Sequence, residues 1–262
     1  MWAAENREKS GCRALASAAG GRHNGVVATA VPAVIVAPPE DIKSHTTAAD
    51  RFVRAEHLEE RYSPFRHMAL TLAISAGLAA MAAALAWRAH LLDWVLMPVF
   101  FVVANALEWA VHRYPMHRPV FPRMMYKNHA MSHHIAFTDR NMPIGPVREL
   151  GLVMMPWYTM LGLFVVASPV MVLAGFLRGP GLSGVFLLGA VLYFLAYETL
   201  HALYHLPEAT LDRILIGRSA IFQRMRAHHA HHHILRRMAF VNFNVTVPLM
   251  DWIFSTKESD PD

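Results

Sequence analysis

Four long apolar stretches restrict this chain more than any other feature of its sequence. They cover about residues 68–87, 94–111, 150–177 and 182–200, and the first and third carry no charged side chain. About twenty apolar residues in a helix span the roughly 30 Å hydrocarbon core of a bilayer. We therefore predict an all-α, polytopic membrane protein with four transmembrane helices.

The short connections between these stretches predict two helical hairpins. Only residues 88–93 separate the first two stretches, and residues 179–181 separate the last two. Pro156 and Pro169 interrupt the third stretch, which we expect to kink or split there. Apolar residues make up 55% of the chain and charged residues only 16%, whereas soluble domains usually carry about 25% charge. The composition thus agrees with a membrane protein.

The distribution of Lys and Arg predicts the orientation of the hairpins. Of the 24 Lys and Arg residues, only Arg88 and Arg178 lie in the two hairpin tips. The others precede the first stretch, lie in the 112–149 loop or follow residue 205. Positively charged loops favour the cytoplasmic side. We therefore predict a multi-pass integral-membrane protein whose histidine-rich helical cap, with the active site, lies on the cytoplasmic side.

The chain divides into two parts by composition. Residues 1–50 are rich in Ala, Gly, Ser and Pro, which predicts a disordered leader, and residues 51–262 form the membrane domain. The charged segment 51–66 predicts a surface helix before the first span.

Cys12 is the only cysteine, so an intrachain disulfide and a thiolate metal site are excluded. The sequence contains no Lys/Arg-rich run of the kind that binds nucleic acid, so we expect no nucleic-acid partner.

Twelve of the seventeen histidines form four clusters at or beyond the ends of the apolar stretches. Neutral imidazole is the commonest protein ligand for transition metals. The clusters predict ten metal ligands: His112, His117, His129, His133, His134, His201, His205, His229, His232 and His233.

The spacing within the clusters suits convergence on metal ions. His201 and His205 are four residues apart and share one face of a helix, as do His129 and His133, with His134 turned further round to reach a second metal. His112 and His117 are five apart, and Pro115 between them predicts that the span ends there and that the chain folds back.

The last cluster allows two helical registers. One uses His229, His232 and His233, and the other uses His228, His231 and His232. We favour the first, which assigns His228 and His231 to supporting contacts.

Three acidic residues are candidates for supporting roles. Glu108 and Glu198 precede a clustered histidine by about one turn, so each is predicted to orient an imidazole by accepting its second N–H. The alternative is a simple interfacial carboxylate. Asp251 is predicted either to pair with an arginine such as Arg236 or to cap a helix.

Ten imidazoles can surround two metal ions with about five each, although imidazole suits iron, copper, zinc and nickel alike. A metal pair at the mouth of a four-helix membrane assembly can receive a long apolar substrate from the bilayer. Oxidation of an unactivated C–H bond requires an oxygen-activating metal. The alternative is a histidine-rich metal-binding or metal-transporting membrane protein, but a transporter is expected to carry ionisable ligands near the bilayer midplane.

The histidine series resembles the fatty acid hydroxylase and sterol desaturase superfamily of integral-membrane di-iron enzymes. The resemblance covers about residues 65–256. It rests on His112-x4-His117, His129-x3-His133-His134, His201-x3-His205, His229-x2-His232-His233, Glu108-Trp109-x2-His112-Arg113 and the tail from Asn242 to Thr256. The second box is one residue longer than is common in fatty acid hydroxylases, as it also is in carotenoid hydroxylases.

This resemblance implies an oxidoreductase with a non-haem di-iron centre held by these histidines. Such an enzyme uses O2 and two electrons to hydroxylate or desaturate a lipid such as a fatty acyl chain, a sterol or a carotenoid. Aldehyde decarbonylation and ether-lipid cleavage are further reactions of the same fold. Two iron ions are the expected cofactors, with zinc as a substitute during expression, and a separate electron donor of ferredoxin or cytochrome b5 type is the expected partner.

Overall fold

The computed structural model describes residues 47–258, and all regular secondary structure in that part of the chain is helical. The predicted leader, residues 1–50, lies almost wholly outside the described residues. The first helix, α1 (Ala48–His57), begins at Thr47, whose side chain accepts a hydrogen bond from the Asp50 N–H. The Asp50 carboxylate in turn accepts one from the Thr47 N–H. This reciprocal capping fixes the start of the helix. The predicted surface helix over residues 51–66 is therefore shorter than expected, because it ends at His57.

Four helical runs are long and apolar enough to cross a membrane, which confirms the predicted fold class. The first, third and fourth contain α2 (Pro64–Ala86), α8 (Trp157–Arg178) and α9 (Pro180–Tyr204), and the second contains α3 (Leu91–Val95), α4 (Met97–Val111) and the π-helix η1 (His112–Met116). Large apolar side chains such as Phe65 and Phe176 are more than 80% exposed. A bilayer accommodates such side chains on the outside of a helix bundle.

The prolines affect the predicted spans in different ways. The third apolar stretch is split at Pro156, where the short helix α7 (Leu150–Val153) has ended and α8 begins, whereas Pro169 lies inside α8 without ending it. Pro115 lies in the π-helical turn η1, and the second span ends one residue later, at Met116, as the sequence predicts. A proline removes one backbone donor, and the wider π turn, bonded from each residue to the fifth before it, tolerates this loss.

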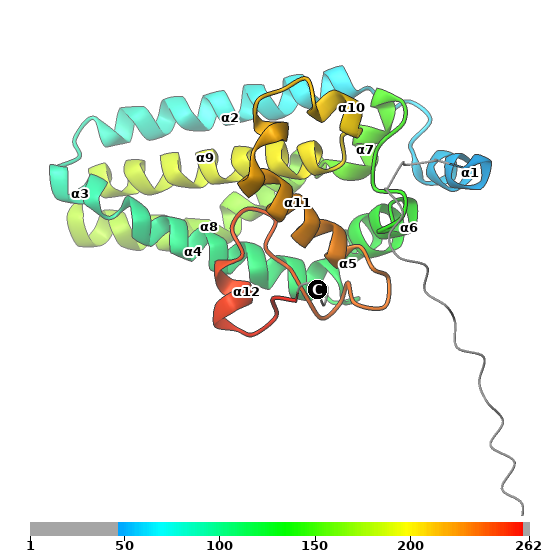
Figure 1. Ribbon diagram of the computed structural model, residues 1–262. Helices are drawn as coiled ribbons and strands as arrows, with labels where there is room; N and C mark the ends of the chain where they lie inside the picture. Colours follow the sequence, from blue (N-terminus) through cyan, green and yellow to red (C-terminus); the bar gives the residue numbers. More distant parts are fainter. Residues whose placement is uncertain (1–46, 259–262) are drawn as a thin grey trace, which may run out of the picture. The chain divides into compact units, whose positions relative to one another are not determined.

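Helix α9 is the central helix of the bundle and packs against α2, α4 and α8 (Figure 1). In its most apolar stretch 56% of the residues are buried, against 11–17% in the other three spans. Gly184 lets α9 approach α2 closely, because a Cβ atom there would lie 2.7 Å from the Ala82 carbonyl oxygen. At the hairpin tips, Arg178 and Asp93 form an ion pair at 2.8 Å, which connects the two hairpins.

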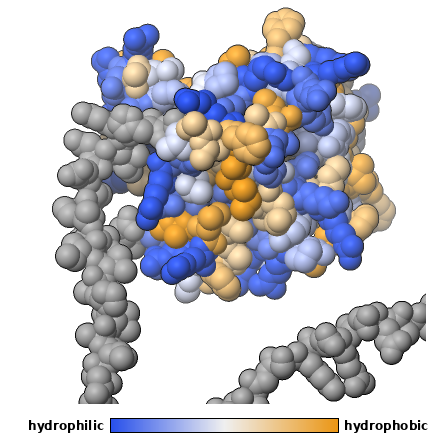
Figure 2. All heavy atoms as spheres, turned by 90° about the vertical axis from the view of Figure 1, so that its right-hand side faces the viewer, coloured by the Kyte–Doolittle hydropathy of each residue, from blue (hydrophilic) through white to orange (hydrophobic). Residues whose placement is uncertain are grey.

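The remaining elements gather at the end of the bundle where α2 begins and α9 ends (Figure 1). They are α5 (Arg123–Tyr126), the π-helix η2 (Lys127–His133), α6 (His134–Ala136), η3 (Val147–Glu149), α7, α10 (Glu208–Leu211), η4 (Ile216–Arg218), α11 (Ala220–His232) and α12 (Leu249–Ile253). Figure 2 looks onto this end, where hydrophilic side chains surround a smaller hydrophobic region. We call this assembly the histidine cap.

Candidate metal centre

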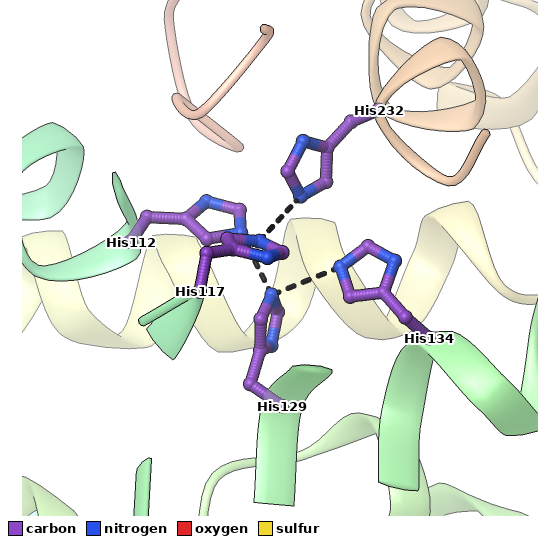
Figure 3. A group of neighbouring side chains, drawn as sticks. All are labelled: His112, His117, His129, His134 and His232. Atoms are coloured by element: carbon purple, nitrogen blue, oxygen red, sulfur yellow. Dashed lines mark hydrogen bonds between the residues drawn. The ribbon is translucent and has the colours of Figure 1, made fainter. Parts of the chain in front are cut away.

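The ten predicted ligands lie in two compact groups, and all ten are buried. Within each group, the candidate ligand atoms all lie within 4.8 Å of one another. The first histidine group contains His112, His117, His129, His134 and His232, and the second contains His133, His201, His205, His229 and His233. Figure 3 shows the first group, with its imidazoles directed toward a common centre. Five imidazoles per group is the number that the sequence predicts for each of two metal ions.

Two π-helical turns bring residues five apart into the first group. His112 begins η1 and His117 follows its last residue, and His129 and His134 are joined by η2. In a π-helix each N–H bonds to the carbonyl five residues earlier, so residues five apart lie nearly above one another. The π turn therefore brings His117 back beside His112 at the end of the span, as the sequence predicts.

Ordinary α-helical spacing builds most of the second group. His201 and His205 are four apart at the end of α9, and His229 and His233 are four apart at the end of α11. His232, the neighbour of His233, points to the first group instead, where its Nε2 lies 3.1 Å from the Nε2 of His117. Helix α11 therefore supplies both groups from adjacent residues.

The hydrogen bonds of His133 and His233 test whether a metal ion fits the second group. The His133 Nδ1–H donates to the Leu152 carbonyl at 2.8 Å, and the His233 Nδ1–H donates to the Phe137 carbonyl at 2.6 Å. A neutral imidazole has one N–H, so both Nε2 atoms carry lone pairs. These two Nε2 atoms lie 3.2 Å apart. Two buried lone pairs at this distance repel each other unless a cation lies between them, so the arrangement fits a bound metal ion.

Burial also keeps the imidazoles in the form that binds metal. Burial lowers the pKa of His133 to about 3. Burial, followed by the influence of neighbouring imidazoles, lowers the pKa of His129, His134, His229 and His233 well below the ordinary value. Neutral imidazole is the ligand form, so little proton competition is expected near neutral pH.

Main-chain carbonyls orient five of the ten imidazoles. Besides His133 and His233, the Nδ1–H groups of His205 and His232 donate at 2.8 Å to the carbonyls of Met142 and Val241. His112 donates in the same way to the Phe243 carbonyl. These contacts fix the tautomer and leave Nε2 free to face the metal.

Glu108 and Glu198 do not make the predicted contacts, because neither is hydrogen-bonded to a histidine within the described residues. The Glu108 carboxylate accepts hydrogen bonds from the Tyr193 hydroxyl and from the Thr246 N–H and hydroxyl. The Glu198 carboxylate accepts from the Met155 N–H at 3.2 and 3.3 Å. Both carboxylates therefore anchor the main chain or a neighbouring helix rather than an imidazole.

The remaining histidines of the last cluster lie outside both groups. The Nε2 of His228 lies 3.2 Å from the Asp251 carboxylate, and His231 lies beside Arg237 and Glu258. Asp251 is thus paired with His228 and matches neither predicted alternative, because it does not pair with Arg236 among the described residues and the N-cap of α12 is Pro248.

Arg54 supports the second histidine group in a way that its sequence context does not reveal. Its guanidinium, 1% exposed, donates to the carbonyls of Ala136, Asn141 and Pro143 and pairs with Glu149 at 2.7 Å. The same loop provides the Phe137 and Met142 carbonyls that orient two imidazoles of the second group. No local pattern separates Arg54 from the other charges of residues 51–66, so only the fold reveals this role.

An apolar cavity of about 200 Å³ lies between α4, α8 and α9 and reaches His112. We call it the intramembrane cavity. Its lining includes Phe100, Leu107, Val111, Phe164, Ala167 and Phe194. The first histidine group therefore adjoins a space suited to hydrocarbon.

The fold and the donor set together define an integral-membrane protein with two histidine groups able to bind metal ions. The Fatty acid hydroxylase family model matches residues 97–256, more than half of the chain, and the chain belongs to that family. The matched region contains all ten clustered histidines of the two groups. Comparison with curated proteins and with solved structures gave no match.

Proposed function

We propose that this chain is an O2-dependent integral-membrane oxidoreductase that hydroxylates or desaturates a lipid at a pair of iron ions. The observation that carries the proposal is the position of the first histidine group, which borders an apolar cavity between membrane-spanning helices through His112 and lies beside the second group. The proposed substrate is a fatty acyl chain, a sterol or a carotenoid. Family membership supports oxygenase chemistry.

The chain's own residues account for holding and insulating the metal site. Five main-chain carbonyls orient imidazoles, and the buried position of all ten excludes bulk water. When bound, an iron pair would supply the oxygen activation that attack on an unactivated C–H bond requires. A separate donor of ferredoxin or cytochrome b5 type would deliver electrons. The Lys and Arg distribution supports a cytoplasmic location of the histidine cap.

Metal content of the detergent-purified full chain tests the site. We expect two iron ions per chain, about one in His201→Ala and about one in His134→Ala, since these variants each remove a ligand from one group. His90→Ala is the matched control, because His90 is exposed and lies at the opposite end of the bundle. Little bound metal in the unmodified protein would contradict the proposal, and two zinc ions would support the ligand set while leaving iron unproven.

Lipid analysis of expressing cells tests the reaction. We expect a lipid heavier by one oxygen atom, dependent on O2 and absent in cells that express His233→Ala. A product lighter by two hydrogen atoms would favour desaturation. If no lipid changes and vesicles containing the protein instead take up metal in a His201-dependent manner, the transport alternative replaces this proposal.

A further inference from the structure

A second hollow, separate from the intramembrane cavity, also borders the histidine groups. It has a volume of about 370 Å³ and is lined by residues 57–67, by η2 and by residues 151–159. We call it the interfacial cleft. Its wall includes His129 of the first histidine group and His133 of the second. Met116 and Met155 line both the interfacial cleft and the intramembrane cavity, so the two hollows meet at this methionine pair.

The main chain at Met155 is held in place although it is not helical. Met155 lies between α7 and α8, where its N–H donates to the Glu198 carboxylate and its carbonyl accepts from the Nε2–H of His67 at 3.0 Å. A broken span requires such partners, because lipid offers none for backbone groups. With the main chain fixed, the long unbranched methionine side chain remains adaptable. The Met155 side chain can therefore change its conformation while its backbone stays in place.

The two hollows differ in chemistry. The intramembrane cavity is almost entirely apolar, and two of its polar groups, Glu108 and Tyr193, are already hydrogen-bonded to each other and to Thr246. It therefore suits a hydrocarbon chain.

The interfacial cleft has a mixed polar and apolar wall, and the side chains of two arginines on that wall have no partner among the described residues. The guanidinium groups of Arg61 and Arg66 form no ion pair or hydrogen bond with the residues that the structure describes, and Glu59 is the only carboxylate in the wall. The first turn of α2 also lines the cleft, and the positive end of a helix favours anions. The cleft therefore suits an anionic group next to the membrane surface.

We propose that the interfacial cleft and the intramembrane cavity form one binding site for a single amphipathic lipid. Arg61 and Arg66 hold its anionic head, a carboxylate or a phosphate, and its chain passes between Met116 and Met155 into the intramembrane cavity. Only the identification of this lipid as the substrate rests on the proposed function. Binding itself requires neither iron nor O2.

Photolabelling of the full chain in phosphatidylcholine nanodiscs tests the head site. The probe is a long-chain fatty acid with a diazirine in its chain, and labelled residues are located by peptide mass spectrometry. We expect labels on α4, α8 or α9 residues of the intramembrane cavity. Palmitate and a lysophosphatidic acid should compete with the probe, whereas hexadecanol and inorganic phosphate should not. Competition by inorganic phosphate alone would identify a simple anion site and overturn the proposal, as would equal competition by hexadecanol.

Removal of the two cations should weaken labelling. For the double variant Arg61→Gln, Arg66→Gln we expect about a tenfold loss at subsaturating probe, because charge-assisted contacts are lost. The control Arg140→Gln, Arg213→Gln removes the same charge from exposed positions outside the cleft and should label normally. Equal labelling of both double variants would overturn the head site.

A bulky residue at the junction tests the path of the chain. Met155→Trp should abolish labels in the intramembrane cavity, whereas Met68→Trp, an exposed position on α2, should not. If Met155→Trp does not fold, Ala167→Phe fills the cavity from α8 and should have the same effect. Unchanged labelling in the folded variant would overturn the proposed path. A failed metal assay would leave these results intact, and failed labelling would leave lipid oxidation open, so the two proposals fail separately.

Discussion

Asp251 connects the C-terminal segment to the first histidine group. Its buried carboxylate accepts hydrogen bonds from the N–H groups of Phe243 and Asn244 at 2.9 and 2.8 Å and from the Thr256 hydroxyl at 2.7 Å. The Phe243 carbonyl in turn orients His112. One carboxylate thus fixes the main chain that positions a candidate ligand.

We expect Asp251→Asn to destabilise the protein and to weaken metal binding in the first histidine group more than in the second. Burial alone would raise the pKa of Asp251, but its hydrogen bonds, the strongest from His228, lower the pKa to about 2 from the ordinary 3.8. Because the folded pKa is depressed, this stabilisation is complete above about pH 4 and is lost as pH falls toward 2. The shift corresponds to about 2 kcal/mol.

Denaturant unfolding near pH 6 and near pH 3 measures this effect. The difference in the free energy of unfolding between Asp251→Asn and the unmodified protein should be smaller at the lower pH. Metal titration should show a larger loss of affinity in the first histidine group than in the second. A variant with unchanged unfolding and equal loss from both groups would exclude the orienting role of Asp251.

The ten histidines of the two groups were predictable from the sequence, but the groups that support them were not. Imidazole clusters at the ends of apolar stretches identify the ten histidines from composition and spacing alone. The carbonyls of Phe137 and Leu152 cannot be found in this way, because every residue has a carbonyl and only the fold selects one. For the same reason Glu108 and Glu198 were predicted from spacing to contact imidazoles, whereas the folded loops place other donors against them.

At the scale of helices, the sequence predicts the membrane spans well. It predicts poorly the turns that orient the histidines. A run of apolar residues determines a spanning helix because no other local structure satisfies its backbone in lipid. The π turns η1 and η2 differ from α-helix by one residue per hydrogen bond, and no residue type encodes that difference. The five-residue separations of His112 from His117 and of His129 from His134 are the one signal present.

The close contact between α2 and α9 gives a prediction for Gly184. We expect Gly184→Leu to force the two helices apart and to lower stability by about 2 kcal/mol or more, because a side chain there meets the Ala82 and Ala86 main chain, which cannot move aside. Metal content should fall with it, since α9 carries His201 and His205. Thermal unfolding and metal analysis in detergent measure both effects. Gly162→Leu is the control, because a Cβ at Gly162 on α8 meets no atom within 4 Å; equal losses in the two variants would refute the packing argument.

For the whole molecule, the two histidine groups join parts of the chain that are far apart in sequence. The first draws on η1, η2, α6 and α11, and the second draws on η2, α9 and α11. A metal ion that binds only this folded arrangement stabilises it by mass action, by about 4 kcal/mol when free metal exceeds Kd a thousandfold. Without metal, the lone pairs of His133 and His233 face each other in a buried site. The histidine cap should therefore depend on metal more than the spans do, whose backbone bonds are internal.

We expect chelation to loosen the histidine cap while the spans persist. After metal removal, limited proteolysis should cut within residues 117–149 and 205–258, and the protected fragments should correspond to the two hairpins. The melting temperature should fall by roughly 10 °C for a loss of about 4 kcal/mol, and returning the metal should restore it. His201→Ala, which keeps the metal of the first group, should melt at a lower temperature and lose only about half of the full shift on chelation, whereas His90→Ala should behave as the unmodified protein. If chelation removes the metal but leaves both the cleavage pattern and the melting temperature unchanged, the histidine groups do not hold the cap together, and the spans and loops alone determine its fold.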